Sequence, residues 1–328
     1  MKLRKINRRK FLKNTAIAGA ALSMPAGWMC SSDKSPYSSK GLPTRMLGKT
    51  GVKVPLMTIG TGSRFMGNTR EKRLEILEYA LDHGLYYWDT AAIYKNKDTD
   101  EYSEQQLGEL LKVRRKEVFL ATKVSDRDPE LAKQTIEQSL KKLQTDYIDL
   151  YQVHSVESVE DAKNIGGPGG VLEVLHQYRD EGVIGHIGFS GHRSGEGMKY
   201  AAENFDFDTM LIAMNHWVQW DENPEKQAIP AAAGKGMGII AMKVIRPKDT
   251  IEGLDVDKLL RYALSLDGIS TAVVGTDSVE VLQKNIETIK NFNPLDDEEM
   301  ESMRLALAPY YQHKNLEWMQ PGYVDGLA

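Results

Sequence analysis

The chain has 328 residues, one cysteine and a formal net charge of −4. A single cysteine excludes an internal disulfide. An acidic balance without a basic stripe argues against nucleic-acid binding. The length is sufficient for one domain with a buried core.

The first 30 residues are unlike the rest of the chain, because they carry seven Lys/Arg residues and no acid. The segment NRRKFLK, residues 7–13, resembles a twin-arginine export signal. The apolar stretch after it is too short and too weakly apolar to span a membrane. We therefore expect the Tat machinery to export the protein to the periplasm, and loss of the seven basic residues changes the net charge from −4 to −11. A basic tail without an export function is the alternative.

Residues 31–42 predict a flexible linker, and residues 43–328 the folded domain. Cys30 is followed by SSDKS, which is typical of a lipoprotein tether at the membrane. The preceding Gly-Trp-Met fits a lipidation box poorly. Cleavage after Ala26 is the competing outcome, and both remain open.

Short β-rich runs alternate with stretches of helical period along the domain. Strands are expected at residues 56–59, 86–88, 118–121, 148–153, 185–189, 210–213, 238–241 and 271–274. Helical periods cover residues 71–84, 129–144, 169–182, 257–268 and 279–292. This alternation predicts an α/β fold, a closed parallel (β/α)8 barrel of the TIM type. A doubly wound sheet is the alternative, although no G-x-G-x-x-G follows the first strand.

Four ionisable residues stand at or just past the ends of apolar runs: Asp89, Tyr94, Lys123 and His154. Active sites of parallel barrels lie at the carboxyl ends of the strands. A tyrosine with a pKa of about 10 can pass a proton at neutral pH if an ammonium group lowers that pKa. A carboxylate would hold the ammonium, and an imidazole would bind the oxygen being protonated. Taken singly, these residues could equally be a helix cap, a loop aromatic, an ion-pair partner and a polar strand end.

Several stretches resemble the aldo/keto reductase family over about residues 43–310. They are YYWDTAAIY, ATKV, QSLKKLQTDYIDLYQVH, GVIGHIGFSGH and VVGTDSVEVLQKNI, in this order. The resemblance implies that Asp89, Tyr94, Lys123 and His154 are the catalytic tetrad. It also implies that PTRMLGKTGVKVP, residues 43–55, is a hairpin closing the bottom of the barrel, and that an extra helix and tail follow the last strand.

The resemblance further implies a nicotinamide dinucleotide bound across the barrel mouth. The positions that match its binding residues are Gly62, Ser63, Ser190, His192, Met242, Lys243, Gly275, Thr276, Asp277, Ser278, Lys284 and Asn285. Two positions depart from the family pattern, since Leu211 stands where a glutamine is common and Met242 where an aromatic is common. Asp277 would repel a 2′-phosphate and so favours NAD slightly over NADP, whereas Lys284 favours the opposite. No metal-ligand cluster is expected.

The expected function is that of an exported oxidoreductase. It would transfer hydride between a bound nicotinamide and the carbonyl or alcohol carbon of a small molecule. Five aromatic residues are candidates for a rim of the site, with ordinary packing as the alternative: Trp217, Trp220, Tyr310, Tyr311 and Trp318. Aromatic faces near acids suit sugars and glycosides, and they suit other alcohols and ketones as well. Export also predicts a tightly retained cofactor, because no pool of reduced nicotinamide is expected outside the cytoplasm. The alternatives are a catalytically silent barrel acting as a binding or sensory subunit, and a barrel lyase or hydrolase.

Overall fold

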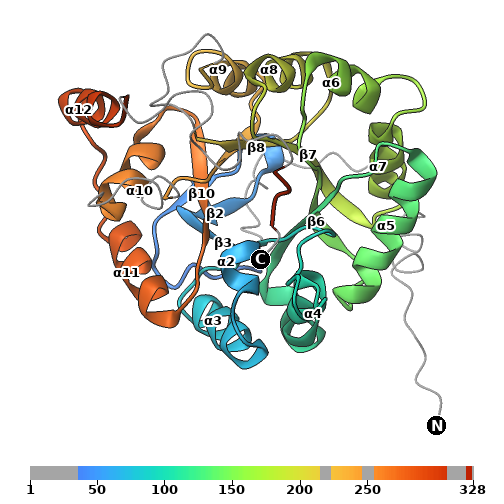
Figure 1. Cartoon of the computed structure of the whole chain (residues 1–328), viewed down its shortest axis with the longest axis horizontal. Coiled ribbons are helices and arrows are strands. Elements are labelled where there is room, and N and C mark those ends of the chain that lie inside the picture. Colours follow the sequence, from blue (N-terminus) through green and yellow to red (C-terminus); the bar gives the residue numbers. More distant parts are fainter. Residues whose placement is uncertain (1–35, 215–222, 246–254, 309–322, 327–328) are drawn as a thin grey trace, which may run out of the picture. The chain divides into compact units, whose positions relative to one another are not determined.

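Eight parallel strands close into a barrel in the computed structural model, which describes residues 36–214, 223–245, 255–308 and 323–326 (Figure 1). In order around the barrel they are β3 (Met57–Gly60), β4 (Tyr87–Asp89), β5 (Phe119–Val124), β6 (Ile148–Val153), β7 (Ile184–Gly191), β8 (Thr209–Ala213), β9 (Gly238–Met242) and β10 (Ile269–Gly275), which pairs with β3. The predicted (β/α)8 barrel is therefore confirmed. The export signal, Cys30 and the five rim aromatics lie outside the described residues.

The strands differ from their predicted ranges mainly at their ends. The largest difference is at β5, which was expected to end at residue 121 and continues to Val124. It continues because its pairing with β6 extends through Lys123 opposite Gln152 and Val124 opposite Val153. Every residue of β5 is buried, since the barrel interior covers one face and the helices cover the other. Lys123 is thereby fixed inside a strand.

Helices surround the barrel (Figure 1). They are α2 (Ser63–Met66), α3 (Arg70–Asp82), α4 (Ser103–Arg114), α5 (Pro129–Lys142), α6 (Val159–Gly166), α7 (Val171–Asp180), α8 (Gly195–Asn204), α9 (Ala228–Gly234), α10 (Val256–Ser265), α11 (Val279–Lys290) and α12 (Asp297–Leu307). Side-chain caps fix several starts, as at α5, where Asp128 accepts from two backbone N–H groups. The described helices include none with the length and apolar character needed to cross a membrane.

The predicted hairpin consists of β1 (Thr44–Met46) and β2 (Lys53–Pro55), with the short helix η1 (Gly48–Thr50) between them. Gly48 lies against the start of β9, where an added Cβ would be 2.1 Å from the backbone nitrogen of Gly238. Arg45 donates to the carbonyl oxygens of Leu264 and Ile269 at the start of β10. These contacts put the hairpin at the amino ends of the strands, so the opposite, carboxyl face holds the candidate site.

Candidate active site

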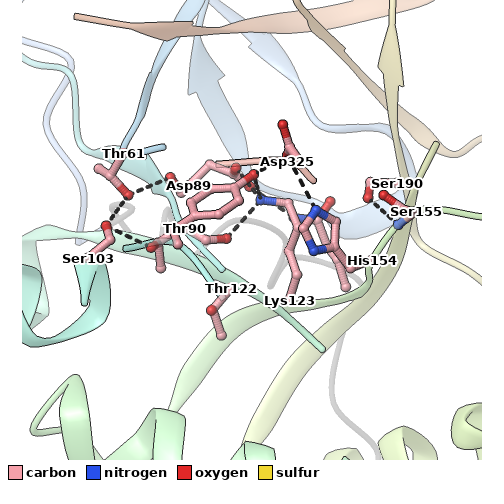
Figure 2. A network of polar contacts seen from close by, with 12 residues as sticks. Thr61, Asp89, Thr90, Ser103, Thr122, Lys123, His154, Ser155, Ser190 and Asp325 are labelled. Carbon is pink, nitrogen blue, oxygen red and sulfur yellow. Dashed lines mark hydrogen bonds and ion pairs between the residues drawn. The ribbon is translucent and has the colours of Figure 1, made fainter. Parts of the chain in front are cut away.

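Asp89 and Lys123 form a buried ion pair at the carboxyl ends of β4 and β5 (Figure 2). Nζ of Lys123 donates to Asp89 Oδ2 at 2.5 Å and to the carbonyl oxygen of Thr90 at 2.8 Å. The amide of Gln152, which lies opposite Lys123 in the sheet, donates to Asp89 Oδ1 at 2.9 Å. Burial raises the pKa of Asp89, and the Lys123 ammonium and the Gln152 amide oppose that rise. These contacts hold the ammonium in a fixed position.

Tyr94 brings its hydroxyl to this ion pair from the loop after β4. Its backbone carbonyl accepts from Ser103, which begins α4, and its N–H donates to Ala91. Nζ of Lys123 donates to the Tyr94 hydroxyl oxygen at 3.4 Å and lies 4.9 Å from the centre of the tyrosine ring. The His154 ring packs edge-on to Tyr94 with the two centres 5.8 Å apart. The four residues thus form a chain of contacts, in which Lys123 joins Asp89 to Tyr94 and Tyr94 packs against His154.

His154 follows β6 and presents its Nε2 to the same point. The hydroxyl of Ser125 lies 3.1 Å from His154 Nδ1. Burial lowers the pKa of His154 to about 4, so the ring is neutral at pH 7. If Ser125 donates to Nδ1, the ring carries its proton on Nε2, and we assign this tautomer from the hydrogen-bond network. A neutral Nε2–H can donate to a carbonyl oxygen, as the tetrad chemistry requires.

A carboxylate from the end of the chain lies between these groups. The segment 323–326 is the dark red piece in the middle of the barrel in Figure 1, and Figure 2 shows Asp325 beside His154. The Tyr94 hydroxyl donates to Asp325 Oδ2 at 2.6 Å, and His154 Nε2 is 3.3 Å from the same oxygen. Lys243, just past β9, donates to Asp325 Oδ1. The tail therefore supplies the acceptor for the tetrad's donors.

The carboxylate changes the ionisation of Tyr94. Burial, the negative charge of Asp325 and that of Asp89 together raise the pKa of Tyr94 well above its ordinary value. This is the opposite of the lowering that Lys123 alone was expected to produce. The pKa of Asp325 is held well below its usual range, because Lys243 and the neighbouring imidazoles outweigh the effect of burial. With the tail in place, Tyr94 keeps its proton and gives its hydrogen bond to Asp325.

A cleft with a volume of about 90 Å³ lies beside Tyr94 while the tail residues Asp325 and Gly326 stand in its lining. Its lining includes Gly60, Gly62, Ser63, Arg64, Leu211, Met242, Lys243, Val273 and Gly275, together with Asp89, Tyr94 and Asp325. Glycine matters on its floor, since a Cβ at Gly60 would come within 2.7 Å of Val273 Cγ1. A Cβ at Gly62 would lie 3.5 Å from the Tyr94 ring. The absence of a side chain at Gly60 therefore lets Val273 pack closely beside the cleft.

Five of the predicted cofactor-binding residues line this cleft: Gly62, Ser63, Met242, Lys243 and Gly275. Thr276 is buried directly after Gly275, and Asn285 is buried on α11. Within the described part of the chain, neither the Thr276 hydroxyl nor the Asn285 Nδ2 atom has a hydrogen-bond partner. Buried polar atoms are rarely left so, and a bound dinucleotide would supply partners for this end of the cleft. The residues present fit such a cofactor.

The remaining predicted cofactor residues lie at other places. Ser190 is buried at the end of β7, where its hydroxyl accepts from the Ser155 N–H at 2.9 Å. The ring of His192 is held by the Ser155 hydroxyl at 3.1 Å and lies 3.7 Å from Asp325. Ser278 caps α11. Lys284 is exposed on the outer surface of α11, away from the cleft.

Three residues of the site were not predicted from the sequence. Arg64, on the short helix α2, lines the cleft and donates from Nη1 to Asp277 Oδ2 at 3.4 Å. Gln152 orients Asp89. Asp325 stands 231 residues after Tyr94, with which it shares a hydrogen bond. Gln152 lies in β6, two residues before His154, and that spacing could have placed it on the same, inner face of the barrel.

The chain is similar to known proteins over most of its length. The model of the aldo/keto reductase family matches residues 56–246. An uncharacterized oxidoreductase of Bacillus subtilis, YqkF, is 25% identical over 293 residues, covering 75% of this chain and 91% of its own. The L-galactose dehydrogenase of Arabidopsis thaliana is 24% identical over 317 residues, covering 84% and 96%.

Solved structures give the same fold. The holo form of an aldo-keto reductase from Bacillus halodurans superposes with a TM-score of 0.67 at 23% identity, covering 81% of this chain and 96% of its own. A putative aldo-keto reductase from Pseudomonas aeruginosa gives 0.62 at 25% identity, covering 77% and 97%.

Proposed function

Because the chain belongs to the aldo/keto reductase family, we propose that it catalyses hydride transfer between a nicotinamide dinucleotide and the carbonyl or alcohol carbon of a small molecule. The observation that carries the proposal is the convergence of the tetrad. Lys123 contacts both the Asp89 carboxylate and the Tyr94 hydroxyl, and His154 Nε2 faces the acceptor of the Tyr94 proton. Tyr94, the general acid, and His154, the second donor, therefore both point at one position, where a substrate oxygen could accept from them.

The side chains divide the work in reduction as follows. A nicotinamide bound in the cleft supplies the hydride. The neutral His154 ring donates from Nε2 to the substrate oxygen and polarises the carbonyl group. Tyr94 passes its proton to that oxygen, and the Lys123 ammonium, held by Asp89, stabilises the phenolate that remains. In oxidation the same tyrosine accepts the proton.

Gly62, Ser63, Met242 and Gly275 would surround the nicotinamide end of the cofactor, and Thr276 and Asn285 its adenosine end. Arg64 is a further candidate, since its guanidinium lies beside the cleft and could meet a phosphate. Asp277 next to it would accept from a free 2′-hydroxyl, which favours NAD slightly over NADP. The positive charge of Arg64 offsets part of the negative charge of Asp277, so the preference for NAD should be small.

The test is oxidation of reduced nicotinamide by the full-length protein with a panel of aldehydes, ketones and 2-oxo acids. Turnover of any member that is lost in Tyr94→Phe supports the proposal. Cofactor binding without turnover of any member would favour the silent binding subunit. If the purified protein contains no nicotinamide and binds none when the cofactor is added, the result would favour a barrel lyase or hydrolase.

Export belongs to the proposal as well. The support is the twin-arginine-like segment at residues 7–13 and the possible tether at Cys30. The Arabidopsis relative acts on L-galactose by its name, which keeps sugars and glycosides among the candidate substrates. Fractionation of cells expressing the full chain, with Arg8→Lys plus Arg9→Lys as the matched variant, tests the route. Export of both proteins alike would contradict it.

A further inference from the structure

Both oxygens of the Asp325 carboxylate are held by donors from the barrel mouth. Oδ2 receives the Tyr94 hydroxyl at 2.6 Å and lies 3.3 Å from His154 Nε2. Oδ1 receives Lys243 Nζ, and also the Tyr323 hydroxyl at 2.9 Å. Hydrogen bonds between ionised partners are the strong ones. The barrel mouth of this chain is therefore a site that binds a carboxylate.

One of those oxygens occupies the place of the reacting oxygen. A general acid must lie within hydrogen-bond reach of the atom it protonates. Oδ2 of Asp325 now fills that position for Tyr94 and His154 together. A substrate oxygen and the Asp325 carboxylate cannot be there at once, so the tail has to leave when substrate binds.

Departure of the tail removes a negative charge from beside Lys243. The side chain of Lys243 is only 11% exposed, and its backbone has φ +61, a conformation that a non-glycine residue adopts at a cost. Of the other charged groups at the tetrad, Lys123 is already paired with Asp89. Burial lowers the pKa of both His154 and His192, so neither ring carries charge at pH 7. A substrate carboxylate in the same place would take over the contact with the partly buried Lys243 ammonium that Asp325 gives up.

We propose that the substrate carries a carboxylate on the carbon next to the reacting carbon, and that Lys243 binds it. The substrate class is thus 2-oxo acids and 2-hydroxy acids, sugar acids included. The C2 oxygen would lie on Tyr94 and His154, and the carboxylate on Lys243. Asp325 is the internal occupant of this site in the absence of substrate. The inference rests on the proposed hydride transfer, and it names the substrate of the same site.

The step balances as an ordinary reduction. C2 of the 2-oxo acid would receive the hydride that reduced nicotinamide supplies when bound, and Tyr94 would give a proton to the C2 oxygen. The products are the 2-hydroxy acid and oxidised nicotinamide, and the Tyr94 phenolate regains its proton from solvent. The carboxylate keeps its charge throughout, so its contact with Lys243 persists.

The kinetic test compares 2-oxobutanoate with its uncharged amide. We expect wild-type kcat/KM to be about tenfold or more higher for the acid, as a charge-assisted contact allows. Lys243→Met should collapse that ratio toward one, largely through KM, and Lys243→Arg should restore part of it. Lys199→Met, an exposed change on α8, is the control and should leave the ratio unaltered. An equal loss for acid and amide in Lys243→Met would overturn the proposal.

A binding test does not depend on turnover. Calorimetric titration with 2-hydroxybutanoate should give about tenfold tighter binding to Asp325→Ala than to wild type, because the competing carboxylate is gone. Gly326→Val gives a second way to displace the tail, since an added Cβ would lie 1.9 Å from Tyr94 Cδ1. Adding Lys243→Met to Asp325→Ala should abolish the gain. Equal affinity in all four proteins would overturn the proposal even if hydride transfer is established.

A third titration distinguishes two sources of anion. If Lys243 serves a phosphate of the cofactor, Lys243→Met will weaken the binding of the dinucleotide and spare the acid-to-amide ratio, and the proposal is then wrong. If Lys243 serves the substrate, dinucleotide affinity will stay within a factor of about two to three, the usual scatter of such contacts. Failure of every carbonyl compound to react, with 2-hydroxybutanoate still bound through Lys243, would count against the hydride transfer and not against the carboxylate site.

Discussion

Replacing Tyr94 with phenylalanine removes one oxygen atom from the centre of the site and little else. The ring would keep its contact with Lys123 Nζ, 4.9 Å from the ring centre, and with His154, 5.8 Å away. The loss is the hydroxyl that donates to Asp325 and accepts from Lys123. A hydrogen bond to a charged group contributes about 1.5–3 kcal/mol, so the fold should persist with a slightly lower free energy of unfolding.

Turnover should fall much further, because the proton donor itself is gone. General acid catalysis contributes at least about 10²-fold, which corresponds to about 2.7 kcal/mol of activation free energy. The assay is oxidation of reduced nicotinamide at saturating carbonyl substrate, with cofactor affinity measured separately by titration. Tyr200→Phe, on the outer helix α8, is the matched control and should behave as wild type. Turnover within a few fold of wild type in Tyr94→Phe would remove Tyr94 from the mechanism.

Three further predictions concern the cofactor and the imidazole. Asp277→Asn should raise the affinity for NADP relative to NAD, because a carboxylate that repels a 2′-phosphate is lost; calorimetric titration of both cofactors checks this, and an unchanged ratio would count against Asp277. If export occurs as proposed, the exported protein should keep its nicotinamide through hours of dialysis, with affinity on the order of nanomolar; release within minutes would contradict retention. The pKa of folded His154 is about 4, below the usual 6.5, so the unfolded chain binds the proton first on acidification. Stability should therefore fall as pH falls from about 6.5 toward 4, and urea unfolding should show a smaller fall in His154→Gln.

The barrel and the meeting of Asp89, Tyr94, Lys123 and His154 at one end of it could be predicted, because both depend on patterns within short stretches of sequence. An apolar run with a polar residue at or near its end indicates a strand that is buried on both faces and carries a functional group at its carboxyl end. Asp89 in β4 and Lys123 in β5 follow this pattern. Strand ends were harder, because the extension of β5 depends on pairing with β6. The pKa of Tyr94 was expected to fall on the strength of Lys123 alone. Burial and two carboxylates, which only the folded arrangement brings together, reverse its direction.

Asp325 could not have been predicted by the same reasoning. The sequence around it, YVDGLA, has no periodicity and no capping pattern. Its contact with Tyr94 depends on where the chain travels after α12. Arg64 was not predicted for a related reason, since its pairing with Asp277 joins the segments that follow the first and last strands of the barrel, 213 residues apart. Contacts of this kind follow from closure of the barrel and leave no local trace in the sequence.

That closure has a consequence for how the protein is assembled. β10 meets β3 along a seam that joins residues far apart in the chain, as in the 3.0 Å contact between the Thr58 and Thr271 hydroxyls across 213 residues. Pairings of such high contact order are slow to form. Gly60 and Gly275 face each other across the seam, and both line the cleft. A dinucleotide bound there would contact both strands of this seam. It would therefore stabilise the closed barrel by an amount set by its affinity and concentration.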